Sequence, residues 1–339
     1  MKRLTVNLVS ESEFTVQGHG VHTAYIEMRN GLEAQPDINL IVNSKPLDNI
    51  AITHIHTVGS FSLRRLISRK GGKKVVSAHI VPESLVGSII GARWWSHIFK
   101  YYLRWFYNRA DMVLAVSPAT KENLVKIGVH KPIEILENSI DTSQYQTTAE
   151  QKRKIREKLD LPQDKFIVVG NGQIQPRKRF DTFIKIAQQL PDIQFIWVGG
   201  IPFKAMGADF IELNHLMKHH PKNMLVTDVI PLAQSRLYTR AADAMFMPSV
   251  QETFGMSIIE GAASGLPIVA RDIHDYAATF GDSIIRTDEK GFAKAIKELY
   301  NSSDYYAKWQ KKSLALAKKY DTKAATTKLV KIYRNLIEL

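Results

Sequence analysis

Two glutamates, Glu252 and Glu260, lie eight residues apart in the segment QETFGMSIIEGAASGLP. The segment reads as a loop followed by a helix over residues 254–264, which Gly265 would end. Glu252 therefore precedes the helix and Glu260 lies within it. Carboxylates accept hydrogen bonds from hydroxyl groups, so a pair on either side of a helix start suits a polyol such as ribose or a hexose.

The start of this helix also offers a seat for a phosphate. The amides of Gly255, Met256 and Ser257 would lie at the helix N-terminus, where N–H groups without a helical partner and the helix dipole favour an anion. The structural alternative is that Glu252 is an ordinary acid near the N-cap and Glu260 an ordinary helix residue.

A second set of residues with phosphate chemistry follows the apolar run FIVVGN. In GNGQIQPRKRFDTFI, Gly170 and Gly172 allow a tight turn, and three cations precede a predicted helix: Arg177, Lys178 and Arg179. Cations at this position would neutralise a diphosphate. A solvated basic turn is the alternative.

A weaker signal lies near the N-terminus, in the glycine-rich segment TVQGHGVHTAY. Gly18 and Gly20 would turn the chain into a helix. The third glycine of a dinucleotide-binding fingerprint is absent, however, and no acidic residue ends the second predicted strand. The turn alone therefore does not identify a ligand.

Two histidines in ITHIHT, His54 and His56, would lie on one face of a strand, as a pair of metal ligands does. No acidic third ligand lies near them in the sequence. Core histidines at the end of a strand are therefore the favoured interpretation.

The elements that must position these residues are strands alternating with helices. Short apolar runs rich in β-branched residues recur along the chain, among them LTVNLV, INLIV, VVSAHI, MVLAVS, FIVVGN, FIWVGG and AMFMPS. Most are separated by amphipathic segments of helical length, and this alternation predicts an α/β protein whose parallel sheets are buried on both faces.

The series of strands restarts after a polar stretch, which predicts two Rossmann-like, doubly wound parallel-sheet domains. Ligands would bind in a cleft beyond the carboxyl ends of the strands. We expect an N-terminal domain over residues 1–145 and a C-terminal domain over residues 146–320. A basic helix over 321–339 could pack back on the N-terminal domain.

The chain has 339 residues and a formal net charge of +13, which predicts an anionic partner. Residues 57–110 hold ten lysines and arginines against a single glutamate, so much of this charge falls in the first domain. The apolar runs are of strand length, and neither a membrane-spanning helix nor a secretory leader is predicted. The absence of cysteine excludes disulfides and thiolate zinc sites and is consistent with a reducing, cytosolic compartment.

Together these residues resemble the retaining glycosyltransferases of family 4, which have the GT-B fold. The resemblance spans nearly the whole chain and rests on segments that occur in the expected order: VVSAHI with His79, ADMVLAVSPATKENLVKIG, IEILENSID, GQIQPRK, and the two glutamates in PSVQETFGMSIIEGAASGLPIVA. It implies a UDP-sugar-dependent hexosyltransferase that requires no metal and no other cofactor. Residues 1–145 would then form the acceptor and membrane-binding domain, and residues 146–320 the nucleotide-sugar-binding domain.

The resemblance implies a role for each matching position. Glu252 would hold hydroxyls of the donor sugar, Glu260 would hold the ribose, and His79 would contact the sugar. Lys178, with Arg177 or Arg179, would neutralise the diphosphate. We expect His79, Lys178 and Glu252 to be catalytic. The other expected donor contacts are helix amides, backbone groups that grip the base, and the glycine loop of the first domain: Gly255, Met256, Ser257, Val229, Ile230, Gly18 and Gly20.

The sequence departs from the family pattern at one phosphate contact. The arginine that commonly lies five residues before the lysine is Gln173 here, so we expect Arg177 to replace it. The resemblance also implies retention by front-face attack, in which the leaving phosphate accepts the proton of the acceptor. Glu252 would then position the sugar, and would not be a nucleophile as in retaining glycosidases.

The segment RWWSHIFKYYLRWFYNR, residues 93–109, is basic and unusually aromatic. On a helix its cations and most of its aromatic residues fall on opposite faces. Such a helix can lie in the interface of an anionic bilayer, and RRLISRKGGKK adds six cations nearby. Packing of the aromatic face on the sheet is the alternative. The expected membrane and acceptor contacts are Arg64, Arg65, Lys73, Lys74, Trp94, Trp95, Arg104 and Trp105.

The donor site and the basic segment together resemble bacterial glycolipid synthases. We expect a peripheral enzyme on the cytoplasmic face of the cell membrane that adds an α-hexosyl unit to monoglucosyl-diacylglycerol, as in lipoteichoic acid anchor synthesis. The sequence leaves open whether UDP-galactose or UDP-glucose is the donor. The alternatives are an undecaprenyl-linked or other cell-wall acceptor and a UDP-sugar epimerase of the same fold. Nucleic acid is not an expected partner, because it would not explain the glutamate pair.

Overall fold

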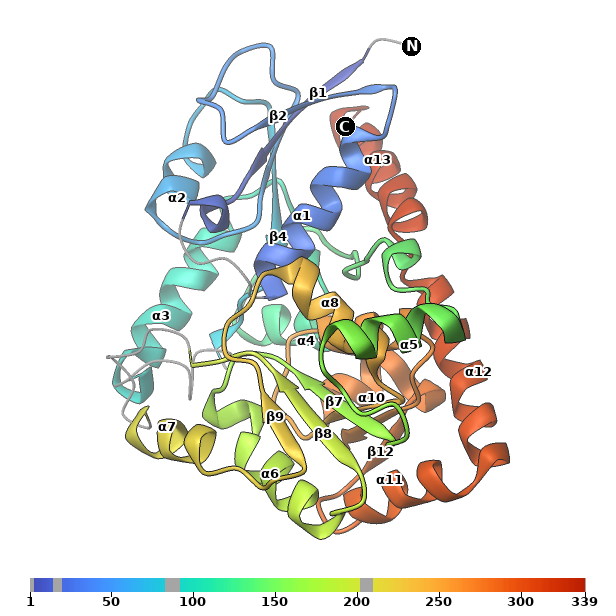
Figure 1. Cartoon of the computed structure of the whole chain (residues 1–339). Coiled ribbons are helices and arrows are strands. Elements are labelled where there is room, and N and C mark those ends of the chain that lie inside the picture. Colours follow the sequence, from blue (N-terminus) through green and yellow to red (C-terminus); the bar gives the residue numbers. More distant parts are fainter. Residues whose placement is uncertain (1–2, 15–19, 83–91, 202–209, 339) are drawn as a thin grey trace. The chain divides into compact units, whose positions relative to one another are not determined.

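The computed structural model describes residues 3–14, 20–82, 92–201 and 210–338 (Figure 1). These residues form two compact units. One comprises the described residues up to Ile140 together with Tyr320–Leu339, and the other comprises Asp141–Lys319. The chain therefore leaves the first unit after Ile140 and returns to it at Tyr320, whereas the sequence predicted boundaries at residues 145 and 320.

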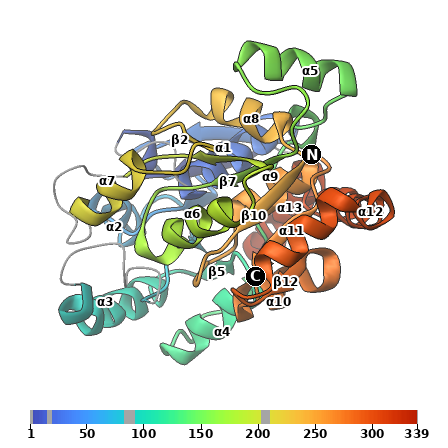
Figure 2. The ribbon, with the colours of Figure 1, turned by 60° about the horizontal axis from the view of Figure 1, so that its bottom comes forward.

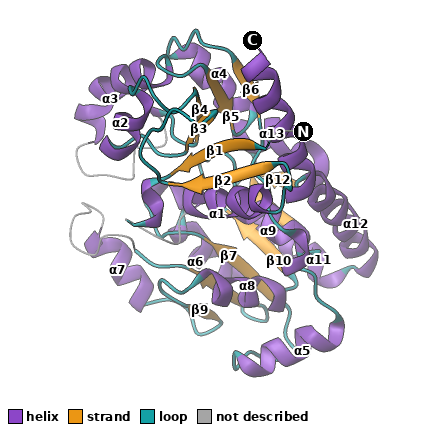
Figure 3. Ribbon diagram, turned by 90° about the horizontal axis from the view of Figure 1, so that it is seen from above, coloured by secondary structure: helices purple, strands orange, loops and turns teal. Residues whose placement is uncertain are grey.

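The N-terminal unit contains a six-stranded sheet in the order β2-β1-β3-β4-β5-β6, in which every neighbouring pair is parallel (Figure 3). The order reverses at β1, so the carboxyl ends of β1 and β3 flank a topological switch point, where open α/β sheets bind ligands. The strands are β1 (Leu4–Val9), β2 (Ile38–Val42), β3 (Ile52–Ile55), β4 (Lys73–Ala78), β5 (Met112–Ala115) and β6 (Ile133–Ile135). The helices are α1 (Gly20–Glu33), α2 (Ser60–Leu66), α3 (Ala92–Tyr107), α4 (Pro118–Lys126) and α13 (Thr322–Glu338).

Both faces of this sheet are covered by helices, because successive strand residues are apolar and point to opposite faces. Val75 packs in one cluster with residues of α1 and α13, and Val76 packs in another with residues of α3 and α4. The helix α13 therefore lies against α1 and contributes Leu329 and Tyr333 to the core of the N-terminal unit (Figure 1).

The C-terminal unit contains a second six-stranded parallel sheet, in the order β12-β11-β10-β7-β8-β9. Its strands are β7 (Ile167–Asn171), β8 (Gln194–Val198), β9 (Met224–Val226), β10 (Ala244–Met247), β11 (Ile268–Arg271) and β12 (Ile285–Thr287). Its helices are α5 (Ala149–Lys158), α6 (Phe180–Gln189), α7 (Phe210–Lys218), α8 (Leu232–Ala241), α9 (Met256–Ala263), α10 (His274–Phe280), α11 (Phe292–Asn301) and α12 (Ser303–Lys319). The last two follow one another and pack together (Figure 2).

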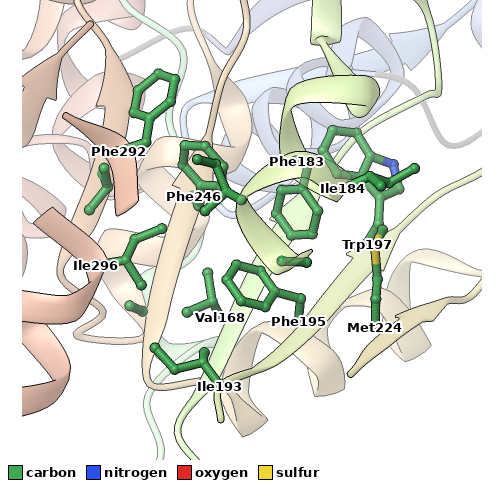
Figure 4. Packing of buried hydrophobic residues seen from close by; sticks show 14 of the residues in the cluster. Val168, Phe183, Ile184, Ile193, Phe195, Trp197, Met224, Phe246, Phe292 and Ile296 are labelled. Atoms are coloured by element: carbon green, nitrogen blue, oxygen red, sulfur yellow. The ribbon is translucent and has the colours of Figure 1, made fainter. Parts of the chain in front are cut away.

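An aromatic cluster fills the space between this sheet and the helices α6 and α11 (Figure 4). Phe183 of α6 stacks on Phe246 of β10 with ring centroids 5.5 Å apart, and meets Trp197 of β8 edge to face at 5.0 Å. A β-carbon on Gly170 would lie 2.7 Å from Phe183 and 2.8 Å from Trp197. Gly170 is therefore required for close packing inside β7, and Gly172, with φ +150°, supplies the turn that follows.

Candidate active site

The two strands that lead into the candidate site are neighbours in the C-terminal sheet. β7 and β10 pair in parallel, so their carboxyl ends meet at one edge of the sheet. After β7 the chain turns into a short 3-10 helix, Pro176–Lys178, and after β10 it runs through a loop to α9. The basic turn and the first glutamate of the sequence motif are brought together by this pairing.

Lys178 and Glu252 form an ion pair in this place. The Nζ atom of Lys178 lies 2.5 Å from Oε1 of Glu252, although the residues are 74 positions apart in the chain. Only 8% of Lys178 and 6% of Glu252 is exposed. Charges so deeply buried persist only when paired and hydrogen-bonded, so each side chain fixes the other.

Arg177 adds a second cation to the same carboxylate. Its Nη1 atom lies 3.4 Å from Oε2 of Glu252 and 3.3 Å from the carbonyl oxygen of Gln251, while its Nε donates to Gln175. Arg179, the sequence alternative, has φ +52° and pairs with Asp181 at 2.7 Å. The structure therefore distinguishes Arg177 from Arg179 as the second cation beside Glu252.

The protonation states follow from burial and from these charges. Burial is the largest single influence on Glu252 and raises its pKa, but the opposing effects of Lys178, Arg177 and Ser249 together outweigh it and hold the pKa below its ordinary value. Burial lowers the pKa of Lys178, and the nearby charge of Glu252 works against that change. Lys178 and Arg177 thus lie side by side at Glu252, and both are side chains that bind phosphate oxygens.

Tyr276 of α10 completes the cluster and was missed by sequence reasoning. Its hydroxyl lies 3.4 Å from Oε1 of Glu252. Burial raises the pKa of Tyr276, and the charge of Glu252 raises it further, so the phenol stays protonated and can donate a hydrogen bond. No motif surrounds this tyrosine in the sequence. Only the packing of α10 beside the loop before α9 reveals it.

The second glutamate, Glu260, lies one turn inside α9 and is also buried. Its Oε2 atom accepts a hydrogen bond of 3.0 Å from Nδ2 of Asn171, the last residue of β7. Ser257 donates to the carbonyl oxygen of Asn171, also at 3.0 Å. Asn171 therefore ties the end of β7 to the first turn of α9, a connection that the spacing of the glutamates does not predict.

The start of α9 has the geometry of an anion seat. Gly255 is the N-cap with φ +94°, and Met256 and Ser257 open the helix. Their amides belong to the first turn, where no helical carbonyl is available to accept. A β-carbon on Gly255 would lie 3.0 Å from the ring of Tyr276, so glycine is favoured there both by backbone conformation and by space.

Val229 and Ile230, expected near the base, follow β9 at the edge of the same sheet. The backbone N–H of Val229 donates to the side chain of Asp228, and Val229 itself is exposed. Asp228 has φ +59°, which turns the chain sharply after the strand. The grip on a base remains an expectation for this loop.

In the N-terminal unit, His79 directly follows β4 and is buried. Its Nε2 atom lies 3.0 Å from Nδ1 of His56. Gly20 is the first residue of α1, and Gly18 lies outside the described residues. In the parts of the chain that the structure describes, no group of three histidine, aspartate or glutamate side chains is arranged to hold a metal ion.

Two family models match the chain. The model described as Glycosyltransferase Family 4 matches residues 13–144, and the model described as Glycosyl transferases group 1 matches residues 151–315. Over 278 residues the chain is 32% identical to the alpha-galactosylglucosyldiacylglycerol synthase of Streptococcus pneumoniae, covering 81% of this chain and 74% of the relative. The chain belongs to glycosyltransferase family 4. The hexosyltransferase class expected from the sequence is thereby confirmed.

A second curated relative of this glycosyltransferase is the processive diacylglycerol alpha-glucosyltransferase of Acholeplasma laidlawii, 28% identical over 274 residues and 80% of each chain. Among solved structures, Anabaena HepE in complex with UDP-glucose superposes with a TM-score of 0.77 at 16% identity, over 98% of this chain and all of that one. The sucrose-phosphate synthase of Thermosynechococcus elongatus has a TM-score of 0.80 at 16% identity, with 99% and 100% coverage. These likenesses confirm the GT-B fold.

The basic helix α3 of the glycosyltransferase presents two kinds of side chain to solvent. Ile98, Tyr101 and Trp105 are 61%, 68% and 41% exposed, and they share one helical face. Leu103, Phe106 and Tyr107 face the sheet and are buried. The expected opposition of cations and aromatic residues is therefore only partly right, because Phe106 packs in the core and Trp105 does not.

Cations border this exposed apolar face. His97, Lys100, Arg104 and Arg109 are exposed, and the Arg109 guanidinium lies 5.0 Å from the ring centre of Trp105. The side chains of Trp94 and Trp95 lie outside the described residues. No helix in the described part of the chain is long and apolar enough to span a bilayer.

Two cations predicted for a membrane surface make structural contacts within their unit. Arg65 is buried, stacks on Phe61 with its guanidinium carbon 3.3 Å from the ring centre, and donates to the carbonyls of Asn43 and Ser44. Lys74 is buried and donates to the carbonyl of Lys70 at 2.6 Å. Both side chains reach backbone oxygens of their own unit, which the sequence did not predict, and their contact with an acceptor or a membrane stays a prediction. Arg64 is exposed, and Lys73 is half-buried.

Proposed function

We propose that this glycosyltransferase moves an α-hexosyl unit from a UDP-hexose to monoglucosyl-diacylglycerol and so produces a diglycosyl-diacylglycerol. The observation that carries the proposal is the cluster of Lys178, Arg177 and Glu252 beside the first turn of α9. It combines a phosphate seat with a sugar-binding carboxylate. The acceptor is supported by the two curated relatives, an alpha-galactosylglucosyldiacylglycerol synthase and a processive diacylglycerol alpha-glucosyltransferase.

In the proposed reaction, the bond between C1 of the hexose and the β-phosphate oxygen breaks. A bond forms between C1 and the acceptor hydroxyl oxygen, on the same face of the sugar. The acceptor proton passes to the departing diphosphate, so no enzyme nucleophile is consumed. Negative charge develops on that diphosphate in the transition state, and Lys178, Arg177 and the α9 amides are already in place to stabilise it.

The two glutamates have separate roles in this proposal. Glu252 holds hydroxyls of the transferred hexose and Glu260 holds the ribose of UDP. Both are buried, so binding costs little further desolvation of the carboxylates. Because two cations meet the diphosphate charge, we propose that no metal is required, and addition of EDTA to the assay is expected to leave turnover unchanged.

We propose that α3 holds the enzyme on the cytoplasmic face of the membrane, where a lipid acceptor is within reach. The support is the exposed face of Ile98, Tyr101 and Trp105 with basic residues on both sides. Aromatic rings favour the headgroup region, and cations bind lipid phosphates. Such binding weakens as salt screens the charges.

A cross of donors against acceptors tests the proposal. Radiolabelled UDP-galactose and UDP-glucose are each incubated with diacylglycerol, monoglucosyl-diacylglycerol or an undecaprenyl-linked sugar in mixed micelles. We expect label to enter a diglycosyl lipid only with monoglucosyl-diacylglycerol, and the more active donor to identify the hexose. Two results would overturn the proposed function. One is transfer of label only to the undecaprenyl acceptor, and the other is formation of the epimeric UDP-sugar without any acceptor.

A further inference from the structure

Three histidines lie together at the carboxyl end of the N-terminal sheet. β3 and β4 pair in parallel with His54 opposite Val75, so His56, just beyond β3, comes close to His79, just beyond β4. All three rings are buried. The rings of His56 and His79 stack with centroids 5.1 Å apart and an interplanar angle of 26°.

Hydrogen bonds place these three rings in two separate networks. His54 binds the hydroxyl of Tyr333 through Nδ1 at 2.6 Å and the hydroxyl of Ser77 through Nε2 at 2.8 Å. His56 binds His79, with Nδ1 of the first 3.0 Å from Nε2 of the second. His56 is therefore the histidine that contacts His79 directly.

The histidines that surround His79 are neutral. Burial lowers the pKa of His54 to about 3, and it lowers the pKa of His56 well below the ordinary value, with the neighbouring rings lowering both further. A neutral imidazole carries a single N–H, on one nitrogen or the other. In the bond between His56 and His79, one ring must donate and the other must accept.

The surroundings of Nε2 of His56 indicate which ring donates in the hydrogen bond between His56 and His79. Within the described residues, Nε2 of His56 is buried and has no hydrogen-bond partner. A buried N–H without a partner is rarer in native proteins than an acceptor left with a spare lone pair. The proton of His56 is therefore best placed on Nδ1, from which it is donated to His79.

We propose that His56 is a positioning residue that sets the tautomer of His79. His56 donates its Nδ1–H to Nε2 of His79, so a singly protonated His79 ring carries its proton on Nδ1. The inference rests on the proposed function, in which His79 contacts the transferred sugar. His79 would act there as a hydrogen-bond donor to a sugar oxygen, and its ring would be held in one orientation by His56.

Nuclear magnetic resonance of the full-length protein labelled with 15N-histidine reads the tautomers directly. Long-range 15N–1H spectra distinguish a protonated ring nitrogen from an unprotonated one, and single histidine substitutions assign the signals. We expect His56 and His79 both to carry the proton on Nδ1. A proton on Nε2 of His79 would overturn the proposal whatever the activity of the enzyme.

Two substitutions of His56 distinguish the effect of its hydrogen-bond donor from the effect of its side-chain volume. His56→Asn places an amide N–H where Nδ1 was, so the Nδ1–H form of His79 should persist. His56→Leu fills the space without a donor, so both tautomers of His79 should appear and kcat should fall on the order of 10- to 100-fold, as misplaced contacting groups do. UDP affinity should not change. Identical His79 spectra in the two variants would contradict the assignment.

Tyr333→Phe is the matched control, because it removes a hydrogen bond from His54 and leaves the bond between His56 and His79 untouched. It should lower the melting temperature but leave the His79 spectrum and kcat near those of the wild type. A different outcome is that both histidines carry the proton on Nδ1 but His56→Leu keeps full turnover. In that case the proposed role of His79 fails, and the positioning role of His56 fails with it. The hydrogen-bond direction would then stand alone.

Discussion

At the scale of single residues, the feature that matters most for the proposed reaction is the carboxylate of Glu252. In the structure described here it is the counter-ion of Lys178 and Arg177. In the proposed reaction those cations face the diphosphate of the donor instead. Donor binding would therefore replace the carboxylate of Glu252 by the diphosphate as the anion beside Lys178 and Arg177. The two cations are already in place before the donor binds.

Glu252→Gln should separate nucleotide binding from turnover. Without the carboxylate, the two cations lack their counter-ion and the free protein loses stability, because a buried charge without a partner is costly. UDP restores an anion, so the rise in melting temperature on adding UDP should exceed that of the wild type, while kcat falls about 10²-fold. Thermal-shift and transfer assays measure both effects.

The control for this variant is Glu289→Gln. Glu289 pairs with Arg271 at 3.1 Å and takes no part in the Lys178 cluster. Its loss should leave kcat and the UDP-dependent shift unchanged. An unchanged turnover in Glu252→Gln would instead remove Glu252 from the proposed mechanism.

The two arginines beside Lys178 provide a second test at this scale. Arg177→Ala removes a cation 3.4 Å from Glu252, and it should weaken UDP binding and lower kcat/KM by about tenfold or more. Arg179→Ala removes a cation that pairs with Asp181, and its effect should stay within about twofold, as for exposed ion pairs. Titration calorimetry with UDP compares them. Equal losses would contradict the assignment of Arg177.

At the scale of elements, the first turn of α9 is shaped by Gly255. Its φ of +94° is strained for any residue with a side chain, and an added β-carbon would lie only 3.0 Å from the ring of Tyr276. Gly265, at the other end of the helix, also has a positive φ of +71°, but an added β-carbon there would meet only ordinary contacts from 3.4 Å outwards. The two glycines differ in the space that surrounds them, and only Gly255 lies at the proposed phosphate seat.

Gly255→Ala should therefore lower stability by about 1–3 kcal/mol and also raise the KM for the UDP-sugar. Gly265→Ala should cost about 1 kcal/mol of stability, as is usual for alanine in the left-handed region, without changing that KM. Urea unfolding and steady-state kinetics measure both quantities. A KM that rises equally in the two variants would place the phosphate seat away from α9.

The exposed face of α3 gives the second prediction for an element. Replacement of Ile98, Tyr101 and Trp105 by serine should release the protein from vesicles that contain anionic lipid, because the apolar contact with the headgroup region is lost. Flotation of vesicles with bound protein measures the loss. Transfer to a short-chain, soluble acceptor should persist.

The matched control replaces Tyr300 and Leu314, two exposed apolar residues of the C-terminal unit, by serine. Vesicle binding should be unchanged in that variant. Retention of the α3 variant on anionic vesicles at low salt would contradict the proposed membrane contact.

The sequence predicts most of the strands and helices, but it does not predict which side chains contact one another. Alternating apolar runs and amphipathic segments correctly predict parallel sheets, since burial on both faces leaves a direct trace in composition. Nothing in the spacing reveals that Lys178 binds Glu252, or that Asn171 and Tyr276 join the glutamates. The burial of Arg65 and Lys74 was missed for the same reason. Which carbonyl a long cationic side chain reaches depends on tertiary packing.

At the scale of the whole molecule, stability should depend on pH through the buried histidines. The pKa of His54 is about 3 in the folded protein, against an ordinary value of 6.5. Between these values the unfolded chain binds a proton that the folded protein excludes, so stability is complete above about pH 6.5 and falls as the pH decreases towards 3. Urea unfolding of the full chain at several pH values measures this. His54→Gln should flatten the profile, and a wild-type stability that rises on acidification would contradict it.

The last twenty residues have a consequence for synthesis. The N-terminal unit is interrupted in sequence by 141–319 and is completed only by α13, whose Tyr333 reaches back to His54. On the ribosome, the interrupting segment can emerge whole and fold while the earlier strands still lack their closing helix. The strands that are made first would then be the last part of the protein to mature, because they await helix α13, which is synthesised long after them.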